Sequence, residues 1–277
     1  MIYEERPAPP GLEGIVSRLR MLETTPLRRF EKILPLPSVH VIVNLSAPYR
    51  LFDRQGAATL VSDAFVSGIQ SEYLVIESPA TIRHVAAELL PASLPMVTDA
   101  APAAVAGRVQ DARRLWTGVD GLVAGIRAAP SPDAALSAFA HFLRAKRTGR
   151  GTDAVVDRTI SAIQADPAQP MGDLAVLGGV SHRTLIARFR AATGLTPKAY
   201  AQIWRFHTFV TAVRDGSPAP DWAGLAAASG FYDQPHVIRA FRRFTGWTPA
   251  DYHRRVIEFG PEAASFVPLD ELPVPGG

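Results

Sequence analysis

The sequence contains no cysteine among its 277 residues. This absence excludes a disulfide framework and any metal site built on thiolates. No stretch approaches the roughly 18 apolar residues that a membrane-spanning helix needs, and no apolar run follows a basic start. We therefore expect a cytoplasmic protein without a membrane partner.

Catalytic and cofactor motifs are also missing. The chain has no Gly-x-Ser-x-Gly, no phosphate-binding loop and no dinucleotide fingerprint. His40 and His84 stand alone without metal-ligand spacing, and a lone histidine on a strand is more often a core or rim residue. We expect no catalytic residue, no cofactor and no metal ion, so the protein is not predicted to be an enzyme.

Charge is sparse and unevenly distributed. Charged residues make up 20% of the chain, and the net charge is only +3. Residues 150–260 contain 13 Lys and Arg against 9 Asp and Glu, whereas the rest of the chain contains 16 against 17. The positive excess lies entirely in one region, which is where a polyanionic partner would be bound.

That region contains an internal repeat between Met171 and Arg255, with an offset of about fifty residues. Leu174, Gly179, Phe189, Thr193-Gly194, Thr196-Pro197 and Tyr200 recur as Leu225, Gly230, Phe241, Thr245-Gly246, Thr248-Pro249 and Tyr252. Each copy predicts two helices joined by a tight turn. Gly179 and Gly230 suit the end of the first helix, and Ser181 and Asp233 suit the N-cap of the second. This is the outline of a helix-turn-helix.

The second helix of each copy is predicted to be amphipathic. Leu185 with Phe189, and Val237 with Phe241, lie four residues apart and share an apolar face. The candidate DNA-contacting residues on or beside the opposite face are His182, Arg183, Ile186, Ala187 and Arg190 in the first copy and Gln234, His236, Arg239, Arg242 and Arg243 in the second. Arginine and glutamine can make bidentate contacts to base edges in the major groove. A single such helix would equally suit a solvated cationic surface, but the duplication favours DNA.

A longer helix is predicted between the copies, over residues 198–214. Thr196 can cap it, and Pro197 suits its first turn. Seventeen residues make a rod of about 26 Å. Such a rod can hold two helices near the roughly 34 Å that separates successive major grooves.

The region resembles the DNA-binding domain of the AraC/XylS family of bacterial transcription regulators. The resemblance extends from Asp153 to Arg255, and its most specific part is Gly-Phe-x-Asp-Gln-x-His-x-x-Arg-x-Phe-Arg-Arg-Phe-x-Gly-x-Thr-Pro-x-x-Tyr, at Gly230 to Tyr252. It implies a monomeric double helix-turn-helix that reads two adjacent major-groove segments of double-stranded DNA. Two residues depart from the family's pattern. Pro235, near the start of the second recognition helix, is tolerated there but offers no backbone N–H donor, and Ala187 offers only a methyl group to a base. The missing cysteine argues against a DNA-repair methyltransferase attached to such a domain, since that chemistry needs a thiol.

The N-terminal half reads as a β-rich domain. Short β-branched or apolar runs occur at residues 39–45, 65–69, 73–77 and 82–90, separated by turn residues. They predict a small barrel or sandwich, and they resemble the β-rich N-terminal domain of one branch of the same family. Residues 101–147 turn alanine-rich and helical in pattern. These helices either pack on the β-domain or supply a dimer surface.

The predicted fold class is therefore α+β, with a small β-rich N-terminal domain carrying a helical extension and an all-α C-terminal domain of two helix-turn-helix motifs joined by a long helix. The predicted boundaries are a lead-in over 1–26, the β-rich domain over 27–147, the DNA-binding domain over 152–260 and a disordered tail over 261–277.

The functional hypothesis is a sequence-specific transcription regulator. Its expected partners are double-stranded DNA, RNA polymerase, a second copy of the chain, and a small-molecule effector bound within residues 27–95. The alternative is a ligand-binding or enzymatic β-domain with a helical module that binds another protein. The outward arginines favour the first hypothesis.

Overall fold

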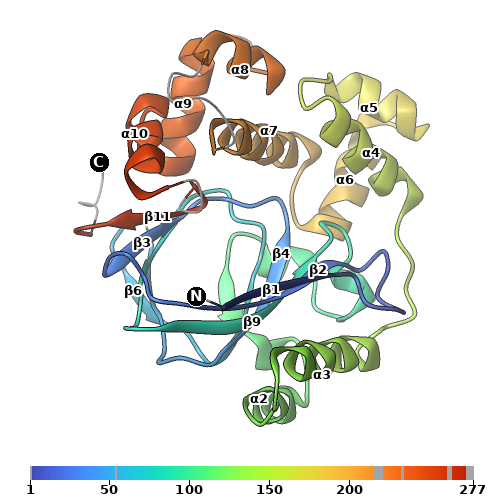
Figure 1. The fold of residues 1–277 in the computed structure, drawn as a ribbon. Coiled ribbons are helices and arrows are strands. Elements are labelled where there is room, and N and C mark those ends of the chain that lie inside the picture. The colour runs from blue at the N-terminus through green and yellow to red at the C-terminus, as the bar shows by residue number, and fades with distance from the viewer. Residues whose placement is uncertain (1, 54, 215–220, 232–233, 261–263, 273–277) are drawn as a thin grey trace.

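The computed structural model describes residues 2–53, 55–214, 221–231, 234–260 and 264–272. Two antiparallel sheets occupy the N-terminal half, and the helices of the C-terminal half lie against one side of them (Figure 1). This arrangement confirms the predicted α+β class.

The strands pair in two sheets. In sheet order, the first contains β1 (Ile2–Pro7), β2 (Val16–Thr24), β9 (Ile82–Leu89), β4 (Val39–Asn44), β7 (Ala64–Ser67) and β10 (Val109–Asp111). The second contains β11 (Phe266–Leu269), β3 (Phe30–Ile33), β8 (Leu74–Glu77), β5 (Arg50–Phe52) and β6 (Ala58–Leu60). Alternate residues along each strand face opposite sides of its sheet.

This alternation divides the buried side chains between two cores. Along β4, Val41 and Val43 belong to a large core that continues through the helices, whereas Ile42 packs against a smaller cluster. The buried members of the smaller cluster come from both sheets and their connections and are Tyr49, Leu51, Val61, Phe65, Ile76 and Ile82. The protein's own side chains therefore pack in the space between the sheets.

A set of short helices follows β9: η1 (Leu94–Met96), α1 (Pro102–Val105), η2 (Ala112–Arg114), α2 (Val119–Arg127) and α3 (Pro132–Ala145). Helix α3 packs against β2 and β9, and α2 packs against α3, away from the C-terminal helices (Figure 1). The interpretation that these helices pack on the β-domain is confirmed, and a dimer surface remains a prediction. Val109–Asp111, which we expected to be helical, forms β10 because β7 offers an edge for pairing.

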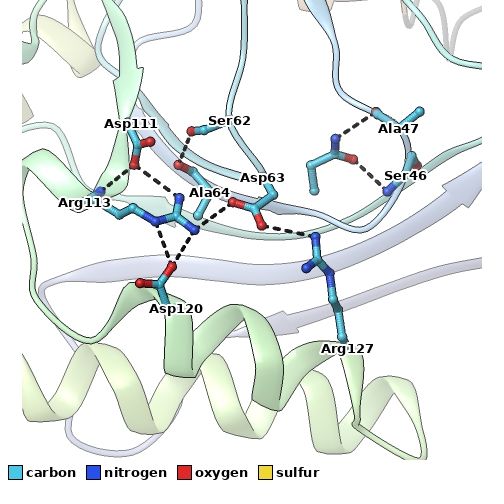
Figure 2. A network of polar contacts seen from close by, with 10 residues as sticks. Ser46, Ala47, Ser62, Asp63, Ala64, Asp111, Arg113, Asp120 and Arg127 are labelled. Atoms are coloured by element: carbon cyan, nitrogen blue, oxygen red, sulfur yellow. Dashed lines mark hydrogen bonds and ion pairs between the residues drawn. The ribbon is translucent and has the colours of Figure 1, made fainter.

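An ion-pair network attaches α2 to the first sheet, as Figure 2 shows. Arg113 donates to Asp120 of α2 at 2.8 Å and to Asp63, which precedes β7, at 2.9 Å. Arg127 reaches Asp63 from the end of α2 at 3.1 Å. Because both arginines donate to Asp63, the three side chains form a network that holds α2 against the strand. Such a network contributes more than an isolated surface ion pair.

Both predicted chain ends are corrected by the structure. The lead-in 1–26 contains β1 and β2, and β2 pairs with β9 from Val16 to Thr24, with a register shift between Val16 and Arg18. Prolines near residues 7–10 obscured the alternation of Leu19 and Met21, which are buried in β2. The tail 261–277 contains β11, which pairs with β3. Pro268 is tolerated there because β11 lies at the sheet edge and needs donors on one side only.

The C-terminal helices follow the predicted order: α4 (Ala154–Ala165), α5 (Met171–Gly178), α6 (His182–Thr193), α7 (Pro197–Arg214), α8 (Trp222–Ala228), α9 (Gln234–Thr245) and α10 (Pro249–Phe259). We call α5 with α6 the first copy and α8 with α9 the second copy. Gly179 adopts a φ of 65° at the end of α5, and the Ser181 hydroxyl accepts from the Thr184 amide to cap α6. The predicted cap Asp233 lies outside the described residues.

Candidate nucleic-acid interface

Helix α6 buries one face and exposes the other. Leu185 and Phe189 are completely buried. Of the candidate residues, His182, Arg183, Ala187 and Arg190 are exposed, and Ile186 is half-buried. Among the described residues, no acidic side chain forms an ion pair with Arg183 or Arg190. The first copy thus presents two unneutralised arginines to solvent.

Helix α9 repeats this arrangement with more charge. Val237, Phe241 and Phe244 are buried, and Arg239, Arg242 and Arg243 are exposed. Within the described part of the chain, Arg239 and Arg242 have no ion-pair partner. The structure brings these arginines onto one helix as predicted.

Two candidate residues of α9 contact neighbouring parts of the domain, one in α7 and one in the segment that precedes α9. Arg243 donates to the Gln202 side chain at 2.9 Å, and the half-buried His236 ring packs edge-on against Phe231 at 5.3 Å. Gln234 begins the helix, but its side chain lies outside the described residues. Arg239 and Arg242 are therefore the α9 arginines without a side-chain partner in the described residues.

Helix α7 holds the two copies together. The Tyr200 ring packs in a tilted orientation against Phe189 of α6, with ring centroids 5.7 Å apart. Phe206 meets Phe241 and Phe244 of α9 at 5.2 and 4.8 Å. Aromatic packing of this kind adds to the hydrophobic stabilisation, so one helix fixes the relative placement of α6 and α9. This confirms the predicted long connecting helix.

The C-terminal ends of α6 and α9 both contact the N-terminal half. Gly194, at the end of α6, has a φ of 79°, and a Cβ added there would lie 2.7 Å from the carbonyl oxygen of Pro102. At the end of α9, the Lys32 ammonium donates to the Thr245 carbonyl at 2.6 Å. Lys32 is 2% exposed, and its Nζ lies 3.7 Å from the centroid of the Trp247 ring. Sequence reasoning missed Lys32, since a lysine in a short strand usually points to solvent.

The two strand histidines both have lowered pKa values. His40 is buried between the Ser38 hydroxyl at 3.1 Å and the Arg20 guanidinium at 3.3 Å. Burial holds the pKa of His40 well below its usual value and lowers the pKa of His84 to about 3. No group of three His, Cys, Asp or Glu in the described residues is arranged to hold a metal ion. A membrane-crossing helix, long and apolar enough for that role, is likewise absent from the described part.

Comparison with known proteins places the repeat in a family. A family model described as "Helix-turn-helix domain" matches residues 174–255. Two curated proteins named as AraC-like transcription regulators, from Streptomyces lividans and Streptomyces antibioticus, are 33% and 35% identical over 104 residues. Residues 174–255 are an AraC-type helix-turn-helix domain. Each match covers 37% of this chain. The chain spans only about a third (34%) of the length of each of these relatives.

Solved structures match beyond the AraC-type domain. ToxT from Vibrio cholerae aligns with a TM-score of 0.52 and 10% identity over 92% of this chain and 98% of its own. A second ToxT structure gives 0.50 and 12% identity over 91% and 97%. A third, bound to (E)-4-(8-methylnaphthalen-1-yl)but-3-enoic acid, gives 0.50 and 12% over 92% and 99%. The likeness shows that the β-rich half and the AraC-type domain form one known two-part fold.

Proposed function

We propose that the protein is a sequence-specific transcription regulator that binds double-stranded DNA through α6 and α9. The observation that carries the proposal is the pair of exposed arginine-bearing helices of an AraC-type domain, packed on the single helix α7. Two adjacent major-groove segments are the expected target, because α7 fixes the spacing between α6 and α9. Catalysis has no part in this proposal.

The residues proposed to contact DNA are His182, Arg183, Ile186, Ala187 and Arg190 of α6 and Gln234, His236, Arg239, Arg242 and Arg243 of α9. Exposure and the lack of an ion-pair partner among described residues support Arg183 and Arg239 as base-reading residues. Arginine binds guanine O6 and N7 with two hydrogen bonds. Ala187 offers only apolar contact, so the first copy is expected to discriminate less among bases.

The N-terminal half is proposed to control the DNA-binding half. One structural relative was solved with a small carboxylic acid bound, which supports a small-molecule effector. Side chains from both sheets pack together in the smaller cluster. We propose that an effector site within residues 27–95 forms when this smaller cluster opens. We also propose that the protein forms a homodimer, contacts RNA polymerase and is located in the cytoplasm.

The proposal is tested by fluorescence anisotropy with duplexes tiled across the protein's own upstream region, at several salt concentrations. We expect one duplex to bind more tightly than a scrambled duplex of equal length, with affinity falling as salt rises. Binding that is indifferent to sequence and to salt would remove the DNA-reading function. A panel of small carboxylic acids, scored by melting temperature and by DNA affinity, tests the effector. If no compound changes either quantity, the N-terminal half has no effector role among this class of ligand.

A further inference from the structure

A small cationic pocket lies between α7 and α9 in the second copy. Its volume is about 140 Å³, and Arg205 of α7 lines it together with Arg239 and Arg243 of α9. Phe231 and Phe244 supply apolar walls. None of the described residues that line it is Asp or Glu. Three arginine side chains thus line one space, with no carboxylate among the lining residues that the structure describes.

Arg205 is the most buried of these three cations. Its Nη2 donates to the Pro167 carbonyl at 2.6 Å, and its guanidinium lies 5.5 Å from the centroid of the Phe231 ring. The Nε atom is buried and has no hydrogen-bond partner. Burial lowers the pKa of Arg205. A buried donor without an acceptor costs about 1–3 kcal/mol, and the positive charge of Arg205 favours an anion in the space that this residue lines.

In each copy, an arginine of the second helix contacts the helix that precedes the copy, although the two arginines lie at different positions of the repeat. In the first copy, Arg188 of α6 donates to both carboxylate oxygens of Asp153, at the start of α4, at 2.6 and 2.7 Å. The hydrogen bond from Arg188 is the main cause that lowers the pKa of Asp153. In the second copy the contact between the preceding helix and α9 joins Arg243 to the neutral amide of Gln202 at 2.9 Å. The contact between the preceding helix and α6 therefore pairs an arginine with a carboxylate, whereas the contact between the preceding helix and α9 pairs an arginine with a neutral amide.

We propose that this pocket binds a phosphate group, and that the backbone of bound DNA supplies it. The inference rests on the proposed function, because it names a contact within the same interface. Guanidinium groups match phosphate oxygens in charge and geometry. Arg239 both lines the pocket and stands on the exposed face of α9. A phosphate held by Arg205 and Arg243 fixes the register of α9 on the duplex, which leaves Arg239 to contact a base and supply sequence preference.

The test uses the full-length Gln202→Glu variant. A glutamate at this position accepts from Arg243 as Asp153 accepts from Arg188, and it places a negative charge at the pocket. We expect affinity to fall by the same factor for the preferred and the scrambled duplex, about eightfold near 0.1 M salt, with the slope of log K against log salt reduced by about 0.9. Gln202→Ala, which adds no charge, should keep the wild-type slope. Ala124→Glu, on the exposed surface of α2, controls for the change in net charge.

A second arm separates the two sources of phosphate. Melting temperatures of the DNA-free protein are compared in inorganic phosphate and in chloride of equal ionic strength. Stabilisation by phosphate in the wild type that disappears in Gln202→Glu means that the pocket also takes phosphate from solution. A wild-type protein that fails to prefer any duplex overturns the proposed function, and this arm still tests the pocket. The phosphate site itself is wrong if the folded Gln202→Glu variant keeps the wild-type salt slope and shows the same response to inorganic phosphate.

Discussion

The Lys32 ammonium on β3 donates a hydrogen bond of 2.6 Å to the carbonyl oxygen of Thr245, the last residue of α9. The C-terminal end of a helix carries partial negative charge, so the cation also meets a favourable dipole. The Tyr73 and Trp247 rings lie 4.0 and 3.7 Å from the same Nζ and shield it from water. One buried side chain of the β-rich half thus fixes the end of a helix proposed to read DNA.

Replacing Lys32 with methionine tests this link. The substitution keeps the length of the side chain but leaves the Thr245 carbonyl without its donor. We expect the free energy of unfolding to fall by about 1–3 kcal/mol, measured by urea denaturation. Lys198→Met, at an exposed position on α7, should stay within about 0.5 kcal/mol of wild type. Equal stability of Lys32→Met and wild type would mean that the hydrogen bond contributes nothing net.

Base reading by α9 is tested at Arg239. Alanine at this position should weaken binding to the preferred duplex by about 1–3 kcal/mol and relax the preference at one base pair. Arg183→Ala should act in the same way at a base pair contacted by α6. Arg114→Ala, an exposed change in η2 of the N-terminal half, is the control. Unchanged preference in Arg239→Ala would show that α9 is placed wrongly on the DNA.

The repeat could be predicted from the sequence because its signals are local. Gly179 ends a helix, Ser181 caps the next one, and Leu185 and Phe189 set its buried face, all within one short segment. The α9 arginines followed from the same spacing. These features need no knowledge of distant parts of the chain.

What could not be predicted depends on distant partners. Lys32 and Thr245 are 213 residues apart, and β11 is a strand only because β3 offers it an edge. Neither relationship leaves a periodic signal. Arg205 sits within the amphipathic pattern of α7, and its unsatisfied Nε arises from three-dimensional packing. Contacts of this kind decide how the two halves meet and where the phosphate pocket lies.

Close packing between the halves is also tested at Gly194. A Cβ there would lie 2.7 Å from both the Pro102 carbonyl oxygen and the Ala106 Cβ, at a φ of 79°. Gly194→Ala is expected to lower the melting temperature more than Gly149→Ala. Gly149 has a similar φ of 77° but nothing within 4 Å of the added atom, so the difference isolates the contact from the backbone strain of about 1–2 kcal/mol. Equal losses would mean that α1 moves aside without cost.

The last prediction concerns the buried carboxyl of Glu31, next to Lys32 in sequence. Glu31 is 9% exposed and accepts a hydrogen bond from Ser78 at 3.2 Å. Burial raises its pKa from 4.5 to about 7, so the folded protein binds a proton that the unfolded chain releases between these values. Stability from this group is therefore complete below about pH 4.5 and is lost as pH rises through about 7, by up to about 3 kcal/mol.

The Glu31→Gln variant keeps the size of the side chain and removes this proton. The free energy of unfolding of the variant minus that of wild type should rise between about pH 4.5 and 7 and level off above. The buried histidines have lowered pKa values and destabilise the fold on acidification, but they are present in both proteins and cancel in the difference. Urea denaturation across this pH range gives the comparison. A difference that stays flat with pH would mean that Glu31 ionises in the folded protein as it does in water.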